Sequence, residues 1–193
     1  MLTPGMSGYH SLMERYPYDP QKAKTLLHEA GYGPGHPLAF TFLSPTIEPA
    51  FTNVPTLLKA QLARIGVQMK IEMLDKVTWM DRFVRQHDFE VTMGNITAFA
   101  LGALAQFLAT TSPLNLARHS DTRVHELCQQ WRTTTEPTAH AQTTERLQGY
   151  LADQVYLIGL ANTPFFHGVR DTVKGYTFAD KLQLNFERVW LAQ

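Results

Sequence analysis

The chain has 193 residues, 44% of them hydrophobic, which is enough for one globular domain or for a larger and a smaller one. Its 17 Lys and Arg residues balance 17 Asp and Glu residues, and no Lys- or Arg-rich run occurs, so charge gives no support for nucleic acid as a partner. The single cysteine, Cys128, excludes an internal disulfide and a multi-thiolate metal site. We expect it to be a buried, inert thiol on a helix.

The first 18 residues are rich in Pro, Gly, Tyr and Ser and are expected to be an irregular lead-in. They contain no basic stretch followed by an apolar core, so they do not have the pattern of a signal peptide. No apolar run in the chain reaches the roughly 18 residues that a membrane span needs. We therefore expect a soluble polypeptide.

The first predicted helix begins at Asp19–Pro20 and ends at Gly31. Asp can accept hydrogen bonds from the amides of the first turn, and Pro is tolerated there because its missing N–H would have no partner in the helix. Gly at the end can adopt the left-handed cap. One apolar stripe runs along this first helix and is formed by Ala23, Leu26, Leu27 and Ala30. A strand over 38–43 is expected to follow the helix.

The second predicted helix is interrupted by Pro49 and Pro55, so we expect it in two pieces. It ends at Gly66, and residues 67–73 then alternate apolar and polar, as a strand with one wetter face does. This order of helix, glycine stop and strand is typical of an α/β layer.

A third helix is expected to start at Asp75 and to carry Trp79, followed by a strand over 89–93. The helix has a stripe of aromatic residues and methionines, which we interpret as core rather than as a cofactor site. Trp79 is nevertheless kept as a candidate ligand contact.

The second half of the chain is predicted to be mainly helical. A loop and a short helix are expected over 98–108, and further helices start at Asp121 and at Thr135–Pro137. Residues 156–161 form a compact apolar run that predicts a strand. The tail after Pro164 is aromatic and strand-like. No internal repeat or low-complexity segment occurs.

Catalytic and metal-binding signatures are missing from the sequence. The chain has eight histidines, but none forms a metal-ligand pattern with another, and His119 and His125 fall on different faces of a helix. The hydrolase turn Gly-x-Ser-x-Gly is absent, and no Ser or Cys has an activating local context. We predict no cofactor, no metal site and no catalytic residue, although a single sequence leaves an enzyme possible.

Ligands of α/β sheets bind outside the carboxyl ends of the strands, where the connecting loops meet. A glycine in such a loop would allow close backbone approach, Asn and Thr would offer neutral donors and acceptors, and Phe a stacking face. The alternative is that each of these residues is an ordinary loop residue. The candidates are Ser44 and Thr46 after the first strand, Leu74 and Asp75 after the second, and Gly94, Asn95, Thr97 and Phe99 after the third.

Several strings resemble the extracellular solute-binding proteins of the dipeptide, oligopeptide and nickel ABC-transporter family. They include Tyr18-Asp19-Pro20, Glu29-Ala30-Gly31-Tyr32, the run from Gln61 to Val67, and Val173-Lys174-Gly175-Tyr176. Their order and spacing agree over nearly the whole chain. The resemblance covers the carboxyl-terminal lobe of that family.

The resemblance implies an α/β fold, one lobe of a type II periplasmic-binding-protein-like (Venus-flytrap) fold with a mixed sheet flanked by helices. It divides the chain into a lead-in from the hinge (1–18), the lobe itself (19–163) and a tail (164–193). The tail would cross back toward an amino-terminal lobe that the chain does not contain. Its apolar residues could then be partly exposed in isolation.

One departure from the family bears on the ligand. Peptide-binding members often have Gly-Trp and then an acidic residue after the third strand, where the carboxylate holds the peptide's amino terminus. Here Asn95 replaces that Trp, and no carboxylate follows it closely in the sequence. Arg85 matches a position that can face the cleft, although the residue by itself favours a solvated charge at a helix end. An uncharged or anionic solute is therefore expected.

The leading hypothesis for function is a substrate-binding lobe of an ABC importer, without enzymatic activity. It would capture a small solute, such as a peptide, and deliver it to a membrane permease from the periplasm or another extracytoplasmic compartment. One alternative is a ligand-sensing domain of a transcription regulator. A third, a small α/β enzyme, would require Asp75, Arg85 and a histidine to converge in one cleft.

Overall fold

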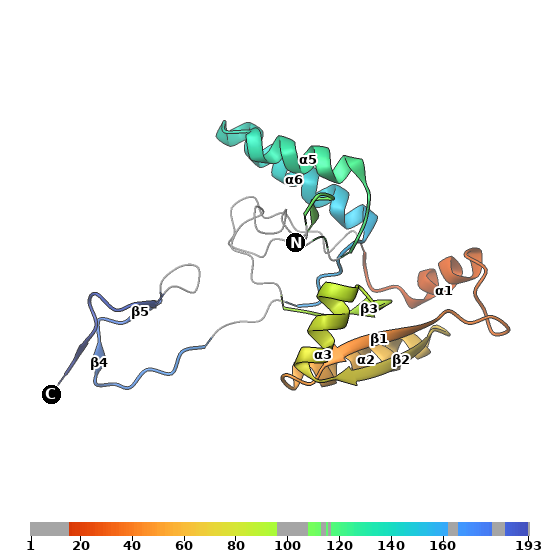
Figure 1. Cartoon of the computed structure of the whole chain (residues 1–193), viewed down its shortest axis with the longest axis horizontal. Coiled ribbons are helices and arrows are strands. Elements are labelled where there is room, and N and C mark those ends of the chain that lie inside the picture. Colours follow the sequence, from red (N-terminus) through yellow and green to blue (C-terminus); the bar gives the residue numbers. More distant parts are fainter. Residues whose placement is uncertain are drawn as a thin grey trace.

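The computed structural model describes residues 16–95, 108–112, 115, 117–161, 166–178 and 184–192. In chain order the first part contains α1 (Pro20–Glu29), β1 (Ala39–Pro45), α2 (Ala50–Ala63), β2 (Gln68–Leu74), α3 (Lys76–Met80), the π-helix η2 (Asp81–Gln86) and β3 (Val91–Thr92). The second part contains α5 (Thr122–Thr133), α6 (Pro137–Gln154), β4 (Val173–Lys174), β5 (Thr177–Phe178), β6 (Leu184–Asn185) and β7 (Trp190–Leu191) (Figure 1).

A three-stranded parallel sheet in the order β2-β1-β3 organises the first part of the chain. The register pairs Ala39 with Gln68 and Pro45 with Leu74, and β3 joins the other side of β1. The helices α2 and α3 contact these strands. Because all three strands are parallel, their carboxyl ends lie at one edge of the sheet. The α/β fold class expected from the sequence is confirmed. The antiparallel strand pairs β4–β7 and β5–β6 form two separate two-stranded ribbons.

Three helices begin at the residues that the sequence indicated. Asp19 accepts a hydrogen bond from the backbone N–H of Lys22 at 2.8 Å, and Asp75 and Asp121 cap α3 and α5 in the same way. At the end of α1, Gly31 has φ 87°, the left-handed conformation that glycine adopts without strain. Local capping therefore sets the helix boundaries.

The expectation that α2 would be split at its prolines is wrong. Pro49 is the N-cap of one continuous helix, and Pro55 lies inside it with its side chain buried. A proline inside a helix leaves the carbonyl four residues earlier, here that of Phe51, without its usual donor. The hydroxyl of Ser44 donates a hydrogen bond to that carbonyl at 2.6 Å, which satisfies the acceptor and keeps the helix intact.

The expected strand over 156–161 is also wrong. Helix α6 ends at Gln154, Val155 takes a left-handed φ of 54°, and no strand follows up to residue 161. Tyr156 instead contacts the residues that precede α5. Its ring stacks on His119 with centroids 4.2 Å apart, and its hydroxyl donates to the N-cap Asp121. The expected strand over 89–93 is present but only two residues long, and the strand-like tail forms the ribbons β4–β7 and β5–β6.

Two groups of buried side chains stabilise the described parts of the fold. The first lies around the sheet and consists of Phe42, Leu43, Phe51, Val67, Met69 and Trp79. The second joins α5 and α6, which run side by side (Figure 1), and consists of Leu108, Val124, Leu127, Cys128, Leu147 and Leu151. Burial raises the pKa of the Cys128 thiol, as expected for an inert cysteine. Within the described ranges, no helix has the length and hydrophobicity of a membrane span.

Asp121 connects α5 with the end of α6. Its Oδ1 accepts the backbone N–H of Arg123 at 2.8 Å, and its Oδ2 accepts the hydroxyls of Tyr150 and Tyr156 at 2.9 Å each. Burial by itself would raise the pKa of this carboxyl. The hydrogen bonds from Tyr156, from Tyr150 and from the backbone N–H groups of Arg123 and Val124 together outweigh that effect and hold the pKa below its usual value.

Replacing Asp121 by Asn is expected to lower the free energy of unfolding by about 1–3 kcal/mol at pH 7, because these bonds are to a charged acceptor. The folded-state pKa lies below the unfolded one, so the stabilisation is complete above about pH 4 and is lost as the pH falls through the folded value. Urea unfolding at pH 7 and pH 3 should show the difference between wild type and Asp121→Asn shrinking in acid. Asp171→Asn, an exposed control, should have little effect, and an equal cost at both pH values would contradict this account.

Candidate functional site

The loops at the carboxyl ends of β1 and β2 are held together by Thr46. Its backbone N–H and its side-chain hydroxyl both donate to the carbonyl of Leu74, at 2.8 and 3.0 Å. Thr46 directly follows β1 and therefore lies at the edge where the sequence predicted a ligand contact. Its side chain is exposed. The double hydrogen bond fixes the start of the loop that leads into α2.

Ser44 is buried and stabilises the fold. It has no exposed surface, and its hydroxyl donates to the Phe51 carbonyl in place of the N–H that Pro55 lacks. A side chain that is buried and already hydrogen-bonded offers nothing to a solute in this conformation. We therefore leave Ser44 out of the ligand site proposed below.

Trp79 is enclosed by other aromatic side chains. It is 7% exposed, and its ring lies 5.1 Å from that of Phe83 and 6.5 Å from that of Phe51, measured between centroids. Its Nε1–H donates to the Thr92 hydroxyl at 2.9 Å, which in turn donates to the Leu43 carbonyl at 2.8 Å. The indole therefore connects α3 with β3 and β1, as the core interpretation expects of Trp79, whereas Met80 of the same stripe is 41% exposed.

Arg85 lies away from the carboxyl ends of the strands. It lies in the last turn of η2, ten residues after the N-cap Asp75, and a helix of that length spans roughly 15 Å. The side chain is 83% exposed and pairs with Asp81 at 3.5 Å. Asp75 and Arg85 thus lie at opposite ends of one helical segment. They do not converge in one cleft, whereas the enzyme alternative would require them to do so.

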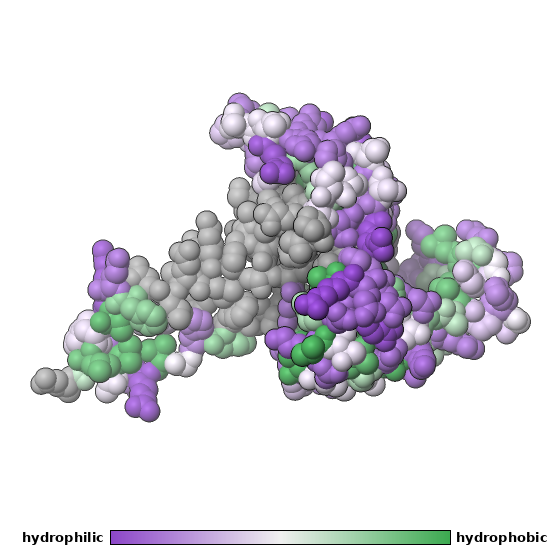
Figure 2. Space-filling view, viewed as in Figure 1, coloured by the Kyte–Doolittle hydropathy of each residue, from purple (hydrophilic) through white to green (hydrophobic). Residues whose placement is uncertain are grey.

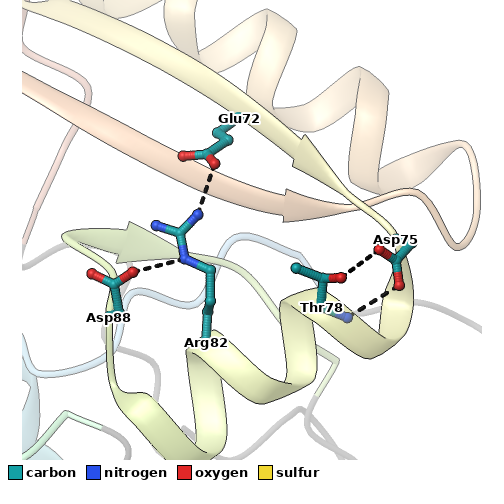
Figure 3. Close-up of polar contacts among 5 residues, drawn as sticks. All are labelled: Glu72, Asp75, Thr78, Arg82 and Asp88. Carbon is teal, nitrogen blue, oxygen red and sulfur yellow. Dashed lines mark hydrogen bonds and ion pairs between the residues drawn. The ribbon is translucent and has the colours of Figure 1, made fainter.

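The segment between Asp75 and Arg85 is fixed by polar contacts (Figure 3). Asp75 caps α3 through Thr78, whose side-chain and backbone hydrogen bonds lower the pKa of the Asp75 carboxyl. Arg82 points from η2 to the carboxylates of Glu72 on β2, at 2.7 Å, and Asp88, at 2.8 Å. These contacts hold the helical segment against β2 and against the residues that precede β3.

Asn95 follows β3 and meets a residue that sequence reasoning did not select. Its Nδ2 donates to Oε1 of Glu48 at 3.1 Å, and both side chains are exposed. Glu48 lies in the loop after β1, so the contact joins two loops at the same edge of the sheet. The strand-end rule could have indicated Glu48, because it lies two residues after Thr46 in the same loop.

Gly94 precedes Asn95 and is exposed, and a Cβ added there would meet nothing within 4 Å. The space beside this Cα is therefore open. The candidates Thr97 and Phe99 lie outside the described residues. Of the predicted site, the structure brings Thr46, Gly94 and Asn95 to one exposed edge.

No group of three or more metal-ligating side chains occurs within the described ranges. The edge formed by Thr46, Glu48 and Asn95 instead combines a hydroxyl, a carboxylate and an amide. Such side chains hold a solute through hydrogen bonds and charge.

Solved structures show which class of protein has this fold. The oligopeptide-binding protein AppA from Bacillus subtilis, in complex with a nonapeptide, matches with a TM-score of 0.76 at 16% identity, over 99% of this chain and 41% of that chain. HbpA2 from Haemophilus parasuis matches with a TM-score of 0.77 at 19% identity, over 97% and 38%. The class is the type II periplasmic-binding-protein fold.

Sequence comparison places the chain in a family within that class. The family model of bacterial extracellular solute-binding proteins, family 5, middle region, matches residues 1–115. The chain therefore belongs to the family 5 solute-binding proteins, as the motif resemblance indicated.

Curated relatives are similar over most of this chain. Di/tripeptide-binding protein 4 of Pseudomonas aeruginosa (strain UCBPP-PA14) is 30% identical over 95% of this chain and 36% of its own length. The dipeptide-binding protein of Escherichia coli (strain K12) is 28% identical over 98% and 37%. The chain thus spans little more than a third of the length of these relatives.

Proposed function

We propose that this chain is one lobe of the substrate-binding component of an ABC importer. The whole component would hold a small solute, such as a peptide, between two lobes and deliver it to a membrane permease. The observation that carries the proposal is the exposed edge formed by Thr46, Glu48 and Asn95 at the carboxyl ends of β1 and β3. Ligands of parallel sheets bind at this edge, and the cited relatives are named for peptides.

Binding in this proposal works by closure of two lobes about a hinge. The solute contacts both lobes only in the closed state and therefore selects that state. The strand-end edge described here would supply one side of the cleft. No chemical step is involved, and the protein would act outside the cytoplasm, as the description of its family implies.

The proposed second lobe would also explain the exposed apolar residues of the tail. Figure 2 shows apolar residues on the C-terminal ribbons. The exposed large apolar residues of the described tail are Phe166 (86%), Val169 (43%), Phe186 (61%), Trp190 (59%) and Leu191 (71%). Large apolar side chains exposed together mark interaction surfaces. We propose that residues 164–193 cross back to the amino-terminal lobe, with 19–163 forming the carboxyl-terminal lobe after the lead-in.

The function can be tested by a thermal-shift screen on a two-lobe protein that includes this chain. Di-, tri- and oligopeptides are added separately, and a bound peptide should raise the melting temperature by mass action. Asn95→Leu should reduce the shift, whereas Asp171→Asn, in the exposed tail, should not. No shift with any peptide or related small solute would contradict the proposed function.

A further inference from the structure

We propose that Glu48, oriented by Asn95, receives a positively charged nitrogen of the solute, an ammonium or guanidinium group. This inference rests on the proposed function and adds the charge of the ligand group bound at this edge. It revises the expectation of an uncharged or anionic solute, which rested on Arg85 and on the residues that follow the third strand in sequence.

Glu48 and Asn95 are 47 residues apart in the chain and meet only because β1 and β3 are neighbours in the sheet. The bond from Asn95 Nδ2 to Glu48 Oε1, at 3.1 Å, uses one acceptor position of the carboxylate. A carboxylate has about four such positions and donates nothing. An exposed acceptor group with most of its capacity open is suited to a donor-rich cation.

Asn95 is the one hydrogen-bond partner of the Glu48 carboxylate among the described residues. Its carboxylate does not cap α2, whose N-terminus has Pro49 as N-cap and no side-chain hydrogen bond. Among the described residues, no Lys, Arg or His forms an ion pair with Glu48. The Asn95 amide orients the carboxylate without neutralising its charge.

The backbone of this loop is fixed independently of the Glu48 side chain. Thr46 is bonded twice to Leu74, and the Glu48 carbonyl accepts the N–H of Phe51 at 3.0 Å. The carboxylate is therefore held at the edge before any ligand arrives, which reduces the entropy cost of binding. Arg85, the cation expected to face the cleft, lies in the last turn of η2 and is paired with Asp81, so it does not offset this charge.

The test is a two-dimensional NMR titration of this chain, because millimolar binding is measurable in that way. The probes are trialanine, which carries an ammonium group, N-acetyl-trialanine, which does not, and N-acetyl-Ala-Lys-Ala, which carries its cation on a side chain. The readouts are the dissociation constant and the shift of the Asn95 side-chain amide. We expect the two cationic probes to bind about 10-fold or more tightly than N-acetyl-trialanine, a difference of about 1.4 kcal/mol.

Glu48→Gln keeps the size and the acceptor for Asn95 but removes the charge, so it should abolish the preference for the cationic probes. Arg85→Gln, a charge change elsewhere on the surface, should leave the preference intact. Equal binding of all three probes, unchanged in Glu48→Gln, would overturn this inference and leave the proposed function standing. No shift at Gly94 or Asn95 with any probe would overturn both.

Discussion

Replacing Trp79 by Ala is expected to lower the free energy of unfolding by about 3–5 kcal/mol, the usual cost of removing a buried large aromatic side chain. The indole is 7% exposed, packs against Phe51 and Phe83, and donates to Thr92. Domains of this kind are stable by only about 5–15 kcal/mol, so the variant should lose much of its stability. Guanidinium unfolding followed by circular dichroism measures the effect.

Trp79→Phe is the matched control, because it keeps an aromatic ring and loses the Nε1–H donor to Thr92. It should cost about 1–2 kcal/mol, since the Thr92 hydroxyl still donates to Leu43. It should also leave solute binding by a two-lobe protein nearly unchanged. If Trp79→Ala were as stable as wild type but lost binding, the indole would be a ligand contact after all.

Ser44→Ala is expected to cost about 1–3 kcal/mol, because it leaves the buried carbonyl of Phe51 without a donor. The cost should depend on Pro55, whose missing N–H creates that requirement. In a Pro55→Ala background the helix can supply its own donor, so the same substitution should cost markedly less. The double-mutant cycle measures this coupling directly.

A cycle with no coupling would contradict the interpretation, since Ser44 would then stabilise the fold independently of the proline. Both single variants should keep the circular dichroism spectrum of the folded chain, so that unfolding free energies can be compared. Ser120→Ala, a substitution at an exposed serine, is the control for loss of a hydroxyl alone and should change stability by less than about 0.5 kcal/mol.

Features set by neighbouring residues could be predicted from the sequence. Asp19, Asp75 and Asp121 all cap helices as expected, because an N-cap contacts amides two or three residues later. Gly31 stops α1 for a reason that is equally local. The helix–strand order up to β3 follows from such signals, and with it the parallel sheet.

Features that depend on distant contacts could not be predicted in this way. The integrity of α2 at Pro55 depends on Ser44, which lies on a strand before the helix. The run 156–161 is apolar like a strand, yet Tyr156 stacks on His119 and donates a hydrogen bond to Asp121. The strand-end rule could have indicated Glu48 itself, but not its contact with Asn95, which lies 47 residues away and meets it only in the folded sheet.

The central claim is that this chain supplies only one side of a two-lobed binding site. Calorimetric titration of the chain alone, with a solute that a two-lobe protein binds at micromolar concentration, tests it most directly. Micromolar binding corresponds to about 8 kcal/mol, and losing half of the contacts would leave a dissociation constant near millimolar. We predict a dissociation constant in the millimolar range for the chain alone. A sub-micromolar dissociation constant for the chain alone would contradict the account.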